Sequence, residues 1–211
     1  MLWTILEKTY QHLLISLVAL LIALCIALPL SFILSQSKNQ RLSLFIVRST
    51  SLIQTMPGLA MLALIVVTLA FVRQVLPIPS TGVLPGVIAL SLYAISPILT
   101  NTYTGITQVS PAMIDVATGL GMTRGQTLFQ VQMPHATPMI MAGIRIAGVW
   151  TIGMCTLASL VGSGGLGDLI LQGLRSMNAH LVLAGTIPAA ILAALFELTM
   201  TTLEKWLAVP K

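Results

Sequence analysis

The sequence is short of charge and of aromatic residues. Only 7% of its 211 residues are charged and 56% are hydrophobic, whereas about a quarter of a soluble domain is charged. Aromatic residues make up 5%, and no regular ten-residue alternation of apolar and polar positions is present, which disfavours an outer-membrane barrel. These shortages exclude a large catalytic domain outside the membrane. They indicate a multi-span, all-α membrane protein.

Cysteine and histidine are few and scattered. Cys25 and Cys155 both lie in apolar runs, so we expect two small buried side chains and neither a disulfide nor a zinc site. His12, His135 and His180 lie far apart along the chain. A membrane enzyme would need His, Asp, Glu or Ser in a cluster on facing helices. We therefore predict no metal site and no catalytic residues.

Long apolar runs are what the sequence has instead. A helix needs about 20 mostly apolar residues to cross a bilayer, and five runs are long enough: residues 13–34, 52–72, 83–104, 139–161 and 181–203. The first run is too long for a signal-peptide core, and no A-x-A-like cleavage site follows it. We predict a single transmembrane domain over residues 1–211, with a polar loop at 105–138.

The distribution of Lys and Arg predicts the orientation, because cytoplasmic loops hold the excess of positive charge. With the N-terminus outside, the cytoplasmic residues are Lys38, Arg41, Arg48, Arg124, Lys205 and Lys211, and the outside residues are Lys8, Arg73 and Arg175. The count favours an outside N-terminus, a cytoplasmic C-terminus and a cytoplasmic loop 105–138. Because the charges are spread along the chain, no nucleic-acid-binding patch is expected.

The first half of this loop predicts a short helix. Ser110 is a preferred N-cap residue, and Pro111 would occupy the first helical position, where a missing N–H costs nothing. Gly119 and Gly121 provide a stop. Ala117 and Gly121, four residues apart, would let another surface approach the backbone closely. The helix is therefore predicted to be a docking element, with an interfacial helix lying on lipid as the alternative.

The second half predicts another helix. Thr123 stands three residues before Gln126, which is the spacing of a capping box. The helix should run from Arg124 toward Pro134, and we expect Pro134 and Pro138 to end it.

Residues of this loop resemble a known family. Asp115–Ala117, Gly121 and Val131–Pro134 match in spacing the E-A-A-x-x-x-G-x9-I-x-L-P loop of ABC importer permeases, with four conservative replacements. The segments Gln54–Pro57, Ser96–Ile106, Gly119–Thr123 and Val161–Gly167 are similar to permeases of osmoprotectant importers for glycine betaine, carnitine and choline.

The resemblance implies a fold, partners and solutes. The fold is a MetI-like ABC importer permease with five spans and a cytoplasmic coupling helix, in a bacterial inner membrane. The partners are a second permease, identical or homologous, two ABC ATPase subunits, a periplasmic or lipid-anchored substrate-binding protein and membrane lipid. The solute is glycine betaine, carnitine or choline, with another small zwitterion or an amino acid as the alternative. A channel or secondary carrier would usually show intramembrane acids or an inverted repeat, so an ATP-independent carrier is the weaker alternative.

The coupling residues follow from the loop motif. They are Asp115, Ala117, Gly119, Gly121, Met122, Arg124 and Pro134. No G-x-x-x-x-G-K-[ST] motif occurs, so no cofactor is expected on this chain, and ATP and Mg²⁺ are expected on the partner ATPase. The segment 162–167 is interpreted as a flexible connection to a short helix at 168–174, near a docking site for the binding protein, or as a plain loop.

Candidate residues for the translocation path are aromatic or polar and lie in or near the spans. A quaternary ammonium group has no N–H to donate, so aromatic faces suit it best. The candidates are Gln54, Tyr93, Asn101, Tyr103, Trp150 and Thr151. Each of them could equally serve helix packing. Arg145 and Glu197 lie toward the cytoplasmic ends of their spans, where a salt bridge, support of the coupling loop or snorkelling would each satisfy the charge.

Overall fold

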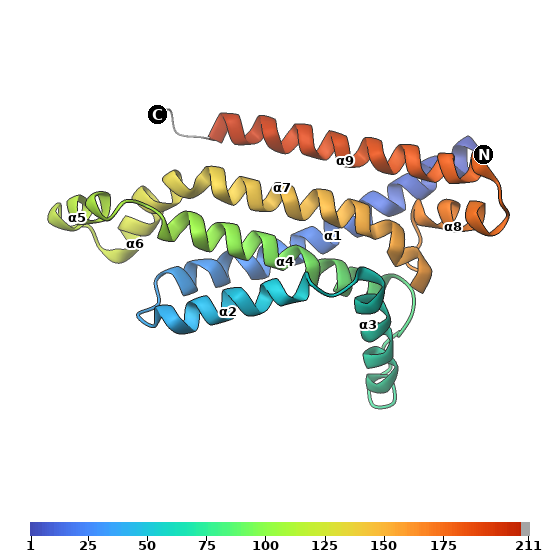
Figure 1. Ribbon diagram of the computed structural model, residues 1–211, viewed down its shortest axis with the longest axis horizontal. Helices are drawn as coiled ribbons and strands as arrows, with labels where there is room; N and C mark the ends of the chain where they lie inside the picture. The colour runs from blue at the N-terminus through green and yellow to red at the C-terminus, as the bar shows by residue number, and fades with distance from the viewer. Residues whose placement is uncertain (208–211) are drawn as a thin grey trace.

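The computed structural model describes residues 1–207, and the regular structure in this range is helical. Four long helices lie side by side along the long axis of the molecule (Figure 1). They are α1 (Leu2–Ser35), α4 (Val83–Thr107), α7 (Met133–Ala158) and α9 (Ala179–Leu207). Each is long and apolar enough to cross a membrane, α7 together with the short segments that adjoin it. The predicted all-α membrane fold is confirmed.

Shorter helices lie around this bundle (Figure 1). α2 (Gln40–Ile53) runs beside α4, and α3 (Gly58–Val72) leaves the bundle sideways. α5 (Pro111–Gly119) and α6 (Arg124–Gln126) lie at one end of the bundle, called the α5 end below. α8 (Gly167–Arg175) lies at the opposite end, called the α8 end.

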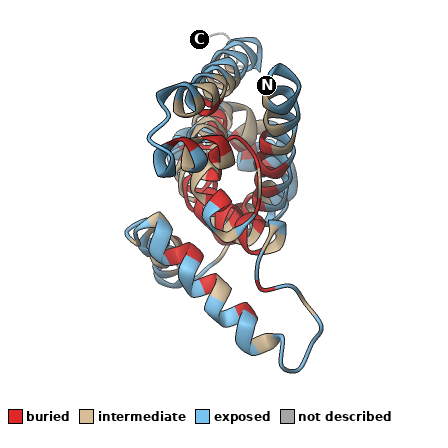
Figure 2. Cartoon of the chain, turned by 90° about the vertical axis from the view of Figure 1, so that its right-hand side faces the viewer, coloured by how far each residue is buried: buried red, intermediate tan, exposed pale blue. Residues whose placement is uncertain are grey.

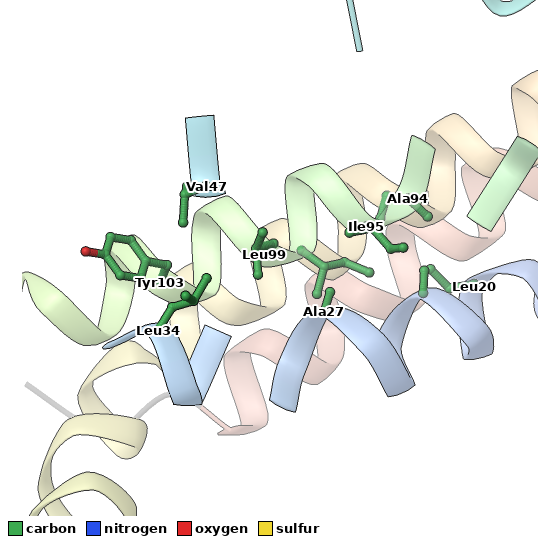
Figure 3. Packing of buried hydrophobic residues seen from close by; sticks show 11 residues of the cluster. Leu20, Ala27, Leu34, Val47, Ala94, Ile95, Leu99 and Tyr103 are labelled. Carbon is green, nitrogen blue, oxygen red and sulfur yellow. The ribbon is translucent and has the colours of Figure 1, made fainter. Parts of the chain in front are cut away.

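The core surrounds α4, and Figure 2 shows the buried residues gathered inside the bundle. One cluster joins α1, α2, α4 and α7 (Figure 3). It consists of Leu20, Ala23, Ala27, Leu34, Val47, Ala94, Ile95, Ile98, Leu99, Tyr103 and Ala147. Four of these residues are alanines, and such small side chains let membrane helices approach one another closely.

The closest approach of α4 and α7 is built on a glycine. A Cβ atom at Gly143 would lie 2.8 Å from Cβ of Asn101 and 2.9 Å from the carbonyl oxygen of Pro97. Carbon atoms in contact are normally about 3.5–4.0 Å apart. The two helices can therefore cross at this distance only because residue 143 has no side chain.

The second apolar run differs from the prediction of one span over residues 52–72. The chain breaks between α2 and α3 at residues 54–57, and the two helices are bent by 99°. Pro57 is the N-cap of α3, so it cannot continue α2. The hydroxyl group of Tyr93 on α4 donates a hydrogen bond to the carbonyl oxygen of Met56, which fixes the break against the bundle.

The first loop helix is present, and its predicted start is confirmed, since Ser110 is the N-cap residue of α5 and Pro111 follows it in the first turn; the Ser110 side chain makes no capping hydrogen bond. One detail of the prediction is wrong. Ala117 and Gly121 do not share a helical face, because α5 ends at Gly119 and Gly121 is left-handed at φ 78°. Ala117 is instead buried within this chain, at 3% exposure.

The second loop helix continues where it was expected to stop. The capping box is confirmed, since Thr123 and Gln126 each accept a hydrogen bond from the other residue's backbone N–H. The chain then passes through a π-helical segment, residues 127–132, into α7. Pro134 lies in the first turn of α7 and Pro138 lies inside it, so neither proline ends the helix. A π-helical segment is one of the recognised ways in which the hydrogen-bond ladder is rearranged within a helix.

Two further expectations can be judged from the structure. Cys155 is buried, but Cys25 is exposed on α1, so the prediction that both are buried is wrong for Cys25. Of the three alternatives for Arg145 and Glu197, the salt bridge is present at 3.6 Å, and Glu204 lies 3.7 Å from the same guanidinium nitrogen. This pair of contacts ties α9 to α7.

Candidate functional site

An apolar groove lies at the α5 end. Val116 is 64% exposed and Leu120 is 77% exposed, and Met113 is also exposed beside them. The groove has a volume of about 410 Å³ and is lined by Ala112, Met113, Val116, Ala117, Leu120, Met122, Val131 and His135. We call it the α5 groove. Large exposed apolar side chains outside the long spans indicate a surface for another protein.

α5 presents this surface because its other face is fixed to the chain. Ala117 is buried and Ile114 is half-buried, whereas Asp115 and Val116 point outward. The amide of Met122 donates to the carbonyl of Ala117 at 3.1 Å, which closes the turn after α5. Side chains on the outward face of α5 therefore point away from this chain and are available to a partner.

The predicted coupling residues gather at this end. Gly119 and Gly121 form the turn after α5, Met122 lines the α5 groove and Arg124 begins α6. Pro134, at the start of α7, lies between Val131 and His135 in sequence, both of which line the groove.

A polar pocket adjoins the α5 groove and shares Met122 with it. It has a volume of about 520 Å³ and is lined by Ser35, Gln36, Ser37, Lys38, Ile114, Thr118, Met122, Arg124, Thr127 and Gln132. Gln36 donates its side-chain amide to Gln132 at 3.0 Å, which joins the end of α1 to the π-helical segment. The two cations of the pocket, Lys38 and Arg124, are both exposed. The pocket therefore adds positive charge beside an apolar docking surface.

The predicted path residues do not all share one face. Tyr103 packs in the core between α1 and α2 (Figure 3). Thr151 is buried and its hydroxyl donates to the carbonyl of Ala147 at 2.7 Å. Asn101 lies against α7 at Gly143, and its side-chain amide donates a hydrogen bond to the carbonyl oxygen of Pro97 at 2.8 Å. These three side chains serve helix packing in this structure.

Two of the other three path residues, Gln54 and Tyr93, lie at the α2–α3 break. Gln54 is exposed within the break. Tyr93 supports the break from α4 through its hydrogen bond to Met56. Trp150 on α7 is 61% exposed.

Sequence reasoning missed a row of hydroxyl groups on α4. Ser96, Thr100, Thr104 and Thr107 follow one another at intervals of three or four residues, which places them on one side of the helix. Thr100 and Thr104 are half-buried and Thr107 is exposed. The hydroxyl oxygen of Thr100 is buried without a hydrogen-bond partner in the described part of the chain. The spacing itself was a signal that could have identified this row.

At the α8 end, α1 holds the glycine-rich segment and the predicted short helix, which is confirmed as α8. Lys8 Nζ lies 2.6 Å from Asp168 Oδ2. Gln11 Oε1 accepts hydrogen bonds from Lys8 Nζ at 3.3 Å and from the amide of Gly165 at 3.4 Å. Asp168 and Arg175 also line an open pocket of about 370 Å³. This end therefore offers a charged surface, in contrast to the apolar α5 groove.

Apolar spans, one broken span and an exposed apolar groove at one end are the features of a multi-pass membrane protein. The chain belongs to the family described as "Binding-protein-dependent transport system inner membrane component", which matches residues 9–209. The resemblance found in the loop motif is therefore confirmed at the level of the family. Membership makes the chain a non-catalytic subunit of a transport system that works with a binding protein and an ATPase.

Curated relatives match almost the whole chain. The carnitine transport permease protein OpuCB of Listeria monocytogenes is 40% identical over 95% of this chain and 86% of its own length. The choline transport system permease protein OpuBB of Bacillus subtilis is 37% identical over 95% of this chain and 87% of its own length. The glycine betaine/carnitine/choline permease OpuCB of Bacillus subtilis is 36% identical over the same shares.

Solved structures share the fold. A chain of the inward-facing MetNI methionine ABC transporter superposes with a TM-score of 0.86 at 19% identity, covering 99% of this chain and 98% of the other. A chain of an amino acid ABC transporter crystallised with histidines gives a TM-score of 0.73 at 20% identity, covering 96% and 92%. The predicted ABC importer permease fold is thereby confirmed.

Proposed function

We propose that this chain is the membrane permease of an ATP-driven importer for solutes with a quaternary ammonium group, such as glycine betaine, carnitine or choline. This solute class is supported by the three curated relatives, which are permeases for carnitine, for choline and for glycine betaine/carnitine/choline and are 36–40% identical over 95% of the chain. The composition of the spans is compatible with it, because apolar and aromatic surfaces suit a cation that has no N–H to donate.

The observation that carries the coupling role is the α5 groove. Two ABC ATPase subunits bind ATP and Mg²⁺, and each docks on the α5 groove of one permease. The two permeases are identical copies or homologues. Movement of the ATPases displaces α5. The turn after α5 leads into α6, which is continuous with α7 through the π-helical segment, so the bundle switches between two openings as a two-state element.

The orientation follows from this docking. The α5 end faces the cytoplasm, and the N-terminus and α8 lie outside, in agreement with the excess of Lys and Arg in the loops of the α5 end. The substrate-binding protein, periplasmic or lipid-anchored, docks at the α8 end.

The test is reconstitution of the complete transporter in liposomes with Val116→Asp. A carboxylate at this exposed position is tolerated by the permease alone but disfavours an apolar docking contact. Burying a valine side chain stabilises a contact by roughly 1.5 kcal/mol or more, so we expect uptake of choline and solute-stimulated ATP hydrolysis to fall about tenfold or more. The matched control is Val75→Asp, the same substitution at a residue that is exposed in the loop after α3.

Three results would each contradict part of the proposal. Normal uptake with Val116→Asp would show that α5 does not couple the ATPase. Uptake by the wild-type complex that needs no ATP would indicate a carrier, and ATP-dependent uptake of other zwitterions without glycine betaine, carnitine or choline would remove the solute class alone.

A further inference from the structure

Trp150 is an exposed tryptophan in the middle of a predicted span, away from the membrane–water interfaces. Exposed Trp and Tyr of membrane proteins gather at the two membrane–water interfaces. The chain has three tryptophans, and Trp3 and Trp206 lie near its ends. Trp150 is at the centre of the span predicted over residues 139–161, and it is 61% exposed. Interfacial anchoring therefore does not explain it.

The contacts of α7 show which way Trp150 points. Gly143, Trp150 and Met154 are spaced by seven and four residues, so they lie on one side of α7. Gly143 lies against Asn101 and Pro97 of α4. Met154 lies directly against Gly58, the first residue of α3. Trp150, between these two contacts, projects toward the junction of α3 and α4 and not toward α9.

This junction cannot face lipid. The last carbonyls of α2, at residues 51–53, accept hydrogen bonds from the amides of residues 54–56, but the first N–H groups of α3 have no partner within their helix, and lipid offers them none. Irregular backbone at membrane depth occurs only where protein or a water-filled cavity meets it. Tyr93, whose hydroxyl binds the carbonyl of Met56 there, is close to the middle of α4, so the break is well inside the membrane.

α4 carries hydroxyl groups that lead from near Tyr93 toward the α5 end. Ser96, the first of the row, is buried, whereas Thr100 and Thr104 are half-buried and Thr107 is exposed. The exposed side chain of Gln54 adds an amide group in the break. Hydroxyls and amides can satisfy water and a carboxylate, but they do not bind a cation that lacks N–H groups.

Acidic side chains do not supply the missing contact for the cation. The chain has five Asp and Glu residues in total. Asp115 is on α5, Asp168 pairs with Lys8 at the α8 end, and Glu197 and Glu204 pair with Arg145. The fifth, Glu7, is on the first turns of α1. A cation on the face of Trp150 therefore meets an aromatic ring and hydroxyl groups, with none of these carboxylates at the junction.

We propose that Trp150 is a contact site for the quaternary ammonium group of the solute on the permease's own passage, a role that rests on the proposed function. The negative face of an indole ring attracts a cation, and among aromatic side chains Trp does so best. A single ring without a carboxylate gives weak binding. Weak binding suits a passage, because the solute must leave the site as readily as it enters.

The test replaces the indole without changing its shape. The complete transporter is reconstituted in liposomes with mono-, di-, tri- and tetrafluorotryptophan at position 150, and the ATP-dependent uptake of choline is measured at a saturating concentration of the choline-loaded binding protein. Fluorine withdraws charge from the ring face, so uptake should fall stepwise with each fluorine. Trp150→Leu should lose roughly 2- to 30-fold, Trp150→Phe should lose less, and Trp206→Leu is the matched control that should keep wild-type uptake.

The outcomes separate this site from the proposed function. Wild-type uptake that does not change along the fluorine series overturns the role of Trp150 and leaves the transporter intact. Loss of the second permease from purified Trp150→Leu complexes, with the fluorine series flat, would show that the indole packs against that subunit instead. Absence of ATP-dependent uptake of glycine betaine, carnitine and choline by the wild-type complex removes both the proposed solute class and the role of Trp150.

Discussion

The close crossing of α4 and α7 makes a quantitative prediction for Gly143→Ala. The new Cβ would lie 2.8 Å from Cβ of Asn101 and 2.9 Å from the carbonyl oxygen of Pro97. Ordinary carbon contacts begin near 3.5 Å, so the helices must separate by about 0.7 Å. One of the two opposing atoms belongs to the backbone, which cannot rotate away. Overpacking of this kind typically destabilises a protein by about 1–3 kcal/mol.

The matched control lies in the same helix. A Cβ at Gly153 would meet no atom within 4 Å, so Gly153→Ala changes only the helix propensity, which favours alanine by about 1 kcal/mol. Gly143→Ala gains the same propensity, and the propensities cancel when the two variants are compared. We therefore expect Gly143→Ala to be less stable than Gly153→Ala by about 1–3 kcal/mol, the full overpacking term.

The assay is reversible unfolding of the purified chain in mixed micelles by increasing the fraction of sodium dodecyl sulfate, with the free energy of unfolding taken from the transition. If the two alanine variants are equally stable, α4 and α7 do not cross at the distance described, and the assignment of Asn101 to helix packing falls with it.

Three other substitutions test separate contacts. Arg145→Met removes the ion pair with Glu197 and should lower the free energy of unfolding by about 1 kcal/mol, the upper value for a partly exposed pair. A double-mutant cycle with Glu197→Gln measures the coupling energy between the two residues, and a coupling energy of zero would refute the salt bridge. Thr123→Ala removes the capping box and should destabilise the start of α6 by about 1 kcal/mol, seen as faster hydrogen exchange at the amide of residue 126 and nowhere in α8. Asp168→Asn breaks the contact with Lys8. The free energy of unfolding should change by less than about 1 kcal/mol, while hydrogen exchange in α8 should become faster. Unchanged exchange would contradict the inference that α1 fixes α8 in place.

Local signals predicted the parts of the fold that depend on neighbouring residues. The apolar runs predicted the four long helices, and the three-residue spacing of Thr123 and Gln126 predicted the capping box. The loop motif predicted the family because its residues lie at fixed spacings within one stretch of the sequence. The Lys and Arg count stays a prediction, as does the role of each coupling residue.

Sequence reasoning missed the features that depend on contacts between distant segments. The sharp break before Pro57 is fixed by Tyr93, which lies 37 residues further along the chain. Pro138 sits inside α7, although a proline normally breaks a helix, because neighbouring helices support it. Ala117 is packed against its own chain at the α5 groove, and no local pattern distinguishes this use of a small residue from contact with a partner.

The chemistry of the exposed surfaces separates lipid from passage. α9 is mostly exposed along its length, and its exposed large side chains include Leu183, Ile187, Ile191 and Leu195. Such a surface suits hydrocarbon, which offers no hydrogen bonds. α4 carries the hydroxyl row from Ser96 to Thr107 instead; Ser96 is buried, Thr100 and Thr104 are half-buried and Thr107 is exposed. The two helices thus differ in the chemistry of their side chains, and the row on α4 offers hydrogen-bonding groups to a hydrated solute.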